Sequence, residues 1–145
     1  MNAPEDITYR LALADGFLAE AEQDWQIERW RSCVDNAQLA AENAGKAVLV
    51  AFGVTPKTHD PVNQVASLLS SHGLSVEMAE IMRGMLPDLM ALGSAEHFMT
   101  DYGDEDQRTL PWDLFKQESA EDALTAARHA FESAKALLAL WEDEE

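Results

Sequence analysis

Several residue types are scarce in this sequence, and each scarcity excludes a class of protein. Cys33 is the only cysteine, so an intramolecular disulfide and a zinc site built from several thiolates are excluded, and a reducing compartment is favoured. No apolar run approaches the roughly 20 residues that a membrane-spanning helix needs, and the first residues lack the basic start and apolar stretch of a secretion signal. We therefore expect a cytoplasmic protein without a membrane segment.

Positive charge is also scarce. The 10 lysine and arginine residues stand against 27 aspartate and glutamate residues, which gives a formal net charge of −17. This charge repels phosphate backbones and disfavours nonspecific nucleic-acid binding, so any RNA contact needs a local basic patch. The acidity fits a salt-rich cytosol, a basic protein partner or simply a soluble surface, and the composition does not separate these causes.

The common sequence motifs of catalysis and ligand binding are missing too. The sequence has no phosphate-cradling glycine loop, no GxSxG serine elbow and no HExxH zinc pair. One acidic segment gathers candidate metal ligands, namely His97, Asp101, Asp104 and Asp106. Its spacing lacks the glycine and the terminal glutamate of a calcium loop. We therefore predict neither a metal site nor a cofactor.

Apolar residues recur at helical spacings along most of the chain, which is the pattern of buried helix faces. The stretches with this pattern are residues 5–25, 27–52, 61–72, 75–102 and 119–141. No window alternates with a period of two for long enough to predict a strand. The 145 residues, 47% of them hydrophobic, have the size and composition of one globular domain, residues 1–145. The predicted fold is all-α, an antiparallel up-down bundle of about five helices with short connections.

Punctuation residues mark where two of these helices are interrupted. Asp60 is a good N-cap and Pro61 suits the first helical position, so His59 is expected just outside the third helix. Within the fourth stretch, Pro87 removes one backbone hydrogen bond. The fourth helix is therefore predicted to be kinked or divided there.

The segment before the last helix, residues 103–118, is polar and rich in turn residues. We predict a loop that is attached to the body of the protein by Trp112 and Phe115. Ser119, followed three residues later by Asp122, has the spacing of a capping box. The last helix is therefore expected to begin at that serine.

Glu42 and Lys46 are separated by one helical turn, with the acid first. In that orientation an exposed ion pair stabilises a helix by a few tenths of a kcal/mol, and an ordinary surface pair is one interpretation. If the two side chains lie beside a cleft, they are instead candidates for contacting a base or a phosphate. The spacing alone leaves both interpretations open.

Three further side chains are candidates for chemistry. Arg128 borders the apolar stripe of the last helix, whereas His129 faces away, because helical neighbours are about 100° apart. Arg128 is either solvated or ion-paired, or it reaches a shared cleft or a dimer partner. His97 and Tyr102 flank the end of the fourth stretch close to several carboxylates, where a histidine can act as a general acid or base.

Three stretches carry a resemblance to the HEPN family of small prokaryotic helical proteins. They are DNAQLAAENAGKAVLVAFG, KTHDPVNQVASLL and the tyrosine-acid segment DYGDED, and together they reach from residue 35 to residue 106. In the family pattern, a glutamate and a lysine in an alanine-rich helix precede a Thr-His segment and a leucine pair. The matching positions here are Glu42, Lys46, Thr58, His59, Leu68 and Leu69.

The resemblance implies a homodimeric helical bundle, often encoded beside a minimal nucleotidyltransferase and working in toxin-antitoxin or defence systems. It makes nucleotide or RNA the expected ligand, with Glu42, Lys46, His59 and Tyr102 as candidate contacts. Many members are metal-independent RNA endonucleases. Their arginine and histidine are separated by four to six residues and pair across the dimer, where they stabilise phosphate charge and shuttle protons.

This sequence departs from the endonuclease pattern, because no arginine is followed by a histidine at that spacing. We therefore expect a noncatalytic nucleotide- or RNA-associated module that acts with a nucleotidyltransferase partner. Two alternatives remain. In one, His97 and Arg128 meet across a dimer groove and cleave RNA without a metal. In the other, the protein is a helical interaction scaffold with no nucleotide role.

Overall fold

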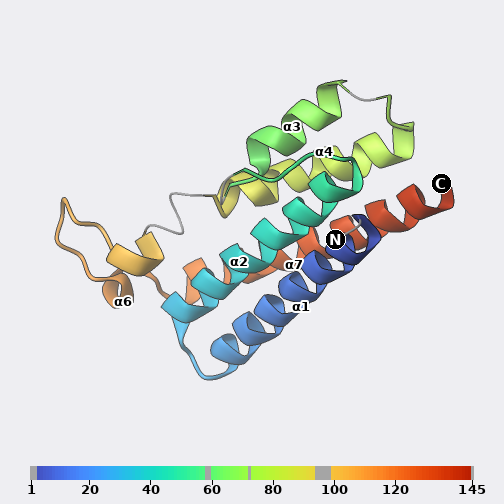
Figure 1. Cartoon of the computed structure of the whole chain (residues 1–145). Coiled ribbons are helices and arrows are strands. Elements are labelled where there is room, and N and C mark those ends of the chain that lie inside the picture. The colour runs from blue at the N-terminus through green and yellow to red at the C-terminus, as the bar shows by residue number, and fades with distance from the viewer. Residues whose placement is uncertain (1–2, 58–59, 72, 94–98, 145) are drawn as a thin grey trace.

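Long helices make up most of the fold (Figure 1). The computed structural model describes residues 3–57, 60–71, 73–93 and 99–144. The helices, in chain order, are α1 Ala3–Gln26, α2 Trp30–Ala51, α3 Val62–Ser71, α4 Val76–Ala91, α6 Pro111–Leu114 and α7 Gln117–Glu144. In the described part of the chain there is no strand, and the sole strand-like pairing is an isolated bridge between Asp104 and Thr109. The prediction of an all-α bundle is confirmed.

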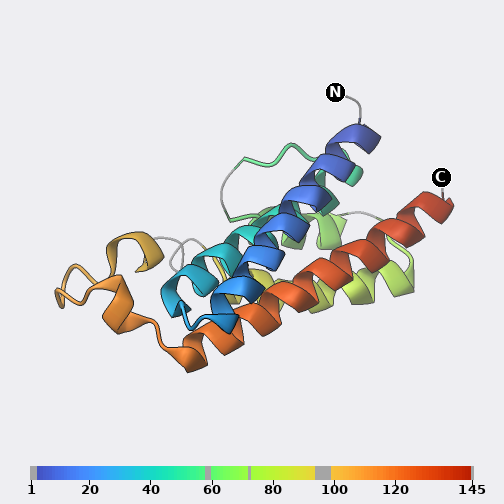
Figure 2. The same ribbon diagram turned by 90° about the horizontal axis from the view of Figure 1, so that it is seen from below.

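The central helix of the bundle is α2, which packs against α1, α3, α4, α6 and α7. Figure 1 shows that α1 is antiparallel to α2 and α7, and that α4 is antiparallel to α7. Successive long helices run in opposite directions with one exception, which is the pair α2 and α3. The connection after α2 returns alongside that helix, so α3 runs in the same general direction as α2. In both views the two termini lie at the same end of the bundle (Figures 1 and 2).

Small side chains allow α2 to be surrounded on several sides. Its alanines are at most 1% exposed at positions Ala37, Ala40, Ala41, Ala44 and Ala47. Helices approach one another closely where the side chains between them are this small. At Gly45 an added Cβ would lie 2.8 Å from Cγ of Pro61 and 3.4 Å from Cδ2 of Leu89. The absence of a side chain at Gly45 is therefore required by packing.

The second helix begins later than its apolar pattern predicts. Glu28 has a φ of +60°, a left-handed conformation that a continuing helix does not adopt, and the amide of Arg29 closes α1 by donating to the Asp24 carbonyl at 2.9 Å. Ile27, which the pattern assigns to a buried face, is 62% exposed. The predicted start at Ile27 is wrong, because a turn at residues 27–29 separates α1 from α2.

Pro87 does not divide the fourth helix. The helix α4 runs without interruption from Val76 to Ala91 with the proline inside it, so a division there, one of the two predicted outcomes, is wrong. At its start, the Ser75 side chain accepts a hydrogen bond from the Met78 amide at 3.2 Å. Before α3, which begins at Val62, Asp60 Oδ1 accepts a hydrogen bond from the Val62 amide at 3.3 Å.

The segment before the last helix contains more structure than a loop. Phe115 is 5% exposed and anchors the segment as predicted, but Trp112 is 64% exposed, so the predicted anchoring by Trp112 is wrong. The last helix begins at Gln117 rather than at Ser119. Ser119 acts from inside the first turn, where its Oγ accepts a hydrogen bond from the Lys116 amide at 3.4 Å.

None of the helices in the described part of the chain combines the length and the apolar character that crossing a membrane requires.

Candidate functional site

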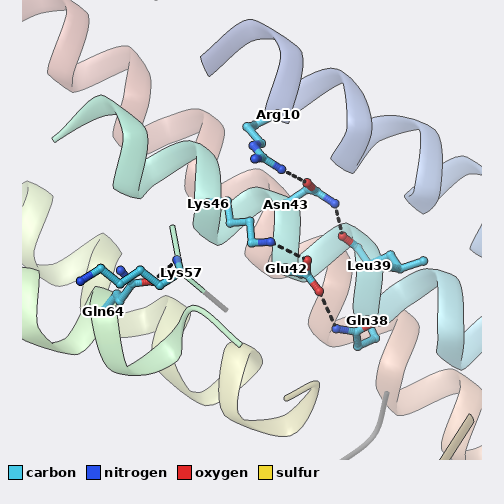
Figure 3. Close-up of polar contacts among 8 residues, drawn as sticks. All are labelled: Arg10, Gln38, Leu39, Glu42, Asn43, Lys46, Lys57 and Gln64. Carbon is cyan, nitrogen blue, oxygen red and sulfur yellow. Dashed lines mark hydrogen bonds and ion pairs between the residues drawn. The ribbon is translucent and has the colours of Figure 1, made fainter. Parts of the chain in front are cut away.

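Glu42 and Lys46 form an ion pair inside the bundle rather than on its surface (Figure 3). Lys46 Nζ lies 2.8 Å from Glu42 Oε2, and the two side chains are only 13% and 6% exposed. The Gln38 amide nitrogen donates to Glu42 Oε1 at 3.1 Å. Their spacing suggested an exposed pair as one interpretation. That interpretation is wrong, because α2 is covered by its neighbours along most of its length.

A second set of polar contacts joins α1 to α2 one residue further along (Figure 3). Arg10 Nη1 donates to Asn43 Oδ1 at 3.2 Å, and the Asn43 amide nitrogen donates to the Leu39 carbonyl at 2.9 Å. Two buried atoms, Arg10 Nε and Gln38 Oε1, lack a hydrogen-bond partner within the described residues. The polar side chains of α2 are therefore surrounded by protein, and the charges of Glu42 and Lys46 lie in a low-dielectric environment.

Gln64 holds the extended segment that leads into α3 (Figure 3). Its side-chain oxygen accepts from the Lys57 amide at 3.2 Å, and its nitrogen donates to the Thr55 carbonyl at 2.9 Å. The Thr-His pair of the resemblance, Thr58 and His59, follows directly and lies outside the described residues.

Arg31 joins the start of α2 to a helical turn at residues 99–102. Its Nε donates to the Thr100 carbonyl at 2.6 Å, and its Nη2 lies 3.6 Å from Asp101 Oδ1. The buried Thr100 hydroxyl donates to Asp35 Oδ1 at 3.1 Å. The sequence did not predict the contacts of Arg31 and Asp35. The one feature that could have indicated them is that the two residues are one helical turn apart and therefore share a helix face.

The neighbouring Tyr102 is 61% exposed. His97, the candidate general acid or base that precedes this turn, lies outside the described residues.

Arg128 and His129 lead to different helices. Arg128 Nε lies 3.0 Å from Glu22 Oε1 on α1, and these side chains are 52% and 46% exposed. His129 Nδ1 contacts Asp88 Oδ2 on α4, with the histidine 57% exposed. The prediction that the two residues point in different directions is confirmed, and of the interpretations left open for Arg128 the ion pair is the one observed.

The described residues contain no group of three or more His, Cys, Asp and Glu side chains arranged to hold a metal ion. Asp104, one of the four residues that suggested such a group, instead closes a local turn. Its Oδ1 accepts a hydrogen bond from the Gln107 amide at 3.1 Å.

A cavity of about 450 Å³ lies between the end of α4, the turn at residues 99–102 and the start of α7. Its lining is largely apolar and carries the carboxyl groups of Asp104 and Asp122. No sequence pattern indicated this cavity, since its walls come from segments that are distant along the chain.

Cys33, the single cysteine, is fully buried. Its Sγ lies 3.9 Å from the Ala120 carbonyl oxygen. Burial raises the pKa of the thiol from 9.0 to about 11, with a further increase from the Asp24 carboxylate and a smaller opposing effect of the Arg128 charge. The thiol is therefore protonated at neutral pH and is a packing group rather than a nucleophile.

Three comparisons place these features beside known proteins. The profile of a family described as "HEPN domain" matches residues 7–137. None of the curated proteins matches the sequence. Among solved structures, the crystal structure of TT1696 from Thermus thermophilus is similar, with a TM-score of 0.70 over 94% of this chain and 99% of that chain, at 20% sequence identity. At this identity the likeness shows a shared fold.

Proposed function

The chain belongs to the HEPN domain family, and from this membership we propose a noncatalytic, cytoplasmic module that binds nucleotide or RNA. In this proposal the single domain acts with a nucleotidyltransferase partner in a toxin-antitoxin or defence-type system. The observation that carries the noncatalytic part is the missing spacing, since none of the arginines is followed by a histidine after four to six residues.

The surroundings of Arg128 support the same conclusion. Its guanidinium group is 3.0 Å from Glu22 of its own chain. An arginine that stabilises phosphate charge in a cleavage reaction must instead direct its donors at the developing negative charge. In an RNA complex across a dimer groove, Glu22 would compensate part of the charge with which Arg128 stabilises the phosphate.

The side chains proposed to contact a nucleotide differ in how exposed they are to solvent. The side chain of Lys46 is 13% exposed, so it would meet a phosphate only through that small exposed part, with Glu42 behind it as its partner. Tyr102 is 61% exposed, and a base can stack on an accessible aromatic ring. Together with His59, these residues are the proposed contacts that the family pattern supplies.

The acidity of the chain supports a basic partner. A net charge of −17 attracts a positively charged protein at long range and speeds its association at low salt. We further propose that the module is a homodimer. Light scattering is then expected to give about twice the chain mass of 16.0 kDa.

RNA cleavage provides the test of the noncatalytic proposal. Purified protein is incubated with single-stranded RNA and a chelator, and no cleavage is expected. Cleavage that persists in the chelator and disappears in both His97→Ala and Arg128→Ala would overturn the proposal in favour of a metal-independent endonuclease. Cleavage that survives both substitutions but is absent from independently purified protein would indicate a contaminating nuclease, whereas cleavage that persists in that protein would also overturn the noncatalytic proposal.

Calorimetric titration separates the module from a scaffold without a nucleotide role. Injection of nucleoside phosphates, and of a short oligoribonucleotide, is expected to give heat that saturates. If neither ligand gives a signal at millimolar concentration, the protein is a helical interaction scaffold.

A further inference from the structure

A cavity of about 430 Å³ lies between the start of α2 and the short helix α6, and none of its lining residues is one that the family pattern supplies. Both views place α6 beside the beginning of α2 (Figures 1 and 2). The walls come mainly from Glu28, Arg29, Trp30, Arg31, Trp112 and Phe115. This volume is within the range of about 300–1,000 Å³ that small-molecule sites occupy.

The lining of this cavity brings two arginines together in a strongly acidic chain. They are Arg29 and Arg31, beside the acidic Glu28, and Arg31 also lies 3.6 Å from Asp101 Oδ1. By contrast, the cavity beside α4 carries Asp104 and Asp122. Guanidinium groups bind phosphate oxygens through paired hydrogen bonds. The start of α2 therefore offers a phosphate two neighbouring arginines, with Asp101 compensating part of the charge of Arg31.

Arg31 is held in position before any ligand arrives. Its Nε is bonded to the Thr100 carbonyl at 2.6 Å, and its Nη2 lies 3.6 Å from Asp101 Oδ1. A guanidinium group has five N–H donors, so these contacts do not exhaust its capacity. An arginine that is already fixed loses little further side-chain entropy when it binds a phosphate.

The aromatic side chains supply a surface for a base. Trp112 is 64% exposed, although it lies on a helix that the buried Phe115 anchors. Trp30 is held by Trp25, whose ring packs edge-on at a centroid distance of 5.2 Å. Bases stack on accessible aromatic rings whatever their identity, and an indole beside two arginines thus matches both parts of a nucleotide.

We propose that this cavity binds a nucleoside phosphate, with the base stacked on Trp112 and the phosphate held by Arg29 and Arg31. The nucleotide is either free or part of a single-stranded RNA. This inference rests on the proposed function and adds a location for its ligand that the family pattern does not supply.

Titration of the whole chain with adenosine monophosphate and with a short oligouridylate, at low salt, tests the site. Trp112→Ala and Arg29→Ala are each expected to weaken binding by about tenfold, the typical loss of one stacking or one phosphate contact. The matched controls are Tyr9→Ala, a similarly exposed aromatic residue at 55%, and Lys135→Ala, an exposed cation at 52%. Both controls should leave the affinity within about twofold.

Two further measurements make the result specific. Trp112→Phe should retain most of the affinity and lose much of the fluorescence quenching that a stacked base causes, a result that a purely structural tryptophan would not give. If Trp112→Ala weakens the binding of oligouridylate but not of adenosine monophosphate, the ligand of the site is an RNA strand. Circular dichroism confirms that each variant is folded.

Binding that is unaffected by both Trp112→Ala and Arg29→Ala would overturn the site, as would equal competition by an acidic peptide. Neither result would bear on the noncatalytic proposal, which depends on RNA cleavage and its loss in His97→Ala. Conversely, chelator-resistant cleavage that both His97→Ala and Arg128→Ala abolish would overturn that proposal and leave the nucleotide site intact.

Discussion

Among single residues, burial changes what the side chains of α2 can do. The thiol of Cys33 and the ion pair of Glu42 and Lys46 are enclosed by neighbouring helices. Desolvation disfavours the charged form of an isolated group. In a buried ion pair, each charge is stable only while its partner compensates it. The thiol and the ion pair should therefore respond differently to labelling, to pH and to substitution than their exposed counterparts.

Cys33 is expected to resist alkylation in the folded protein. Its pKa is raised to about 11, so at pH 8 only about one thiol in a thousand is ionised, and the thiolate is the reactive form. Iodoacetamide labelling followed by mass spectrometry should be slow in buffer and fast in denaturant. Fast labelling of the native protein at pH 8 would contradict the burial of the thiol.

The same raised pKa predicts a loss of stability in alkaline solution. Between the unfolded value of about 9 and the folded value of about 11, the unfolded chain releases the thiol proton while the folded chain retains it. The stability contributed by this group is therefore complete below about pH 9 and falls as the pH rises towards 11. Urea titrations of the protein and of Cys33→Ala should converge in this window.

Lys46→Met is expected to lower the free energy of unfolding by about 3 kcal/mol, because removing one partner leaves the other charge buried and uncompensated. Lys135→Met is the matched control. Its pair with Glu132 spans 3.8 Å with the side chains 52% and 68% exposed, and its loss should cost less than about 1 kcal/mol. Similar effects of the two substitutions in urea titrations would show that the Lys46 pair is not buried.

Among the helices, packing decides whether a glycine can be replaced. Helix propensity alone predicts that Gly→Ala inside a helix adds about 1 kcal/mol of stability. Gly16 on α1 has nothing within 4 Å of an added Cβ, whereas Gly45 on α2 has the Pro61 ring at 2.8 Å. The proline ring is rigid, so it does not rotate away as a flexible side chain would.

Gly16→Ala is therefore expected to stabilise the protein by about 0.5–1 kcal/mol, and Gly45→Ala to destabilise it by about 1–3 kcal/mol through overpacking. Thermal unfolding of the two variants measures the difference directly. An increase in Tm for both would mean that Pro61 is not packed against α2.

For the molecule as a whole, the dominant property is the net charge of −17. Like charges repel more strongly in the compact state than in the expanded chain. Salt shortens the Debye length from about 30 Å at 0.01 M to about 8 Å at 0.15 M. Electrostatic repulsion should therefore weaken as salt is added.

The Tm is expected to rise by about 3 °C between these salt concentrations, which corresponds to roughly 1 kcal/mol for a chain of this size. A neutral sugar at the same osmolality is the control and should have a smaller effect. A Tm that stays constant or falls with added salt would show that local ion pairs, such as that of Arg128 and Glu22 at 3.0 Å, outweigh the general repulsion.

The helices and most of their buried faces could be predicted from the order of residues alone. The apolar stripe of the stretch 27–52 includes Ala37, Ala44 and Val48, which are fully buried, because helical periodicity is a local property. The errors fall where local signals compete with packing. The apolar pattern extends the second helix to Ile27, and the aromatic side chain of Trp112 predicts an anchor, yet both side chains are exposed.

The environment of the charged groups, by contrast, became known only from the packed bundle. The spacing of Glu42 and Lys46 is the same in an exposed pair and in a buried one, and the covering helices make the difference. Likewise, Arg31 contacts Thr100, which lies 69 positions away, and the cavity at the start of α2 gains Trp112 from a helix far along the chain. Such contacts depend on how whole helices pack, and periodicity along a single helix carries no information about that arrangement.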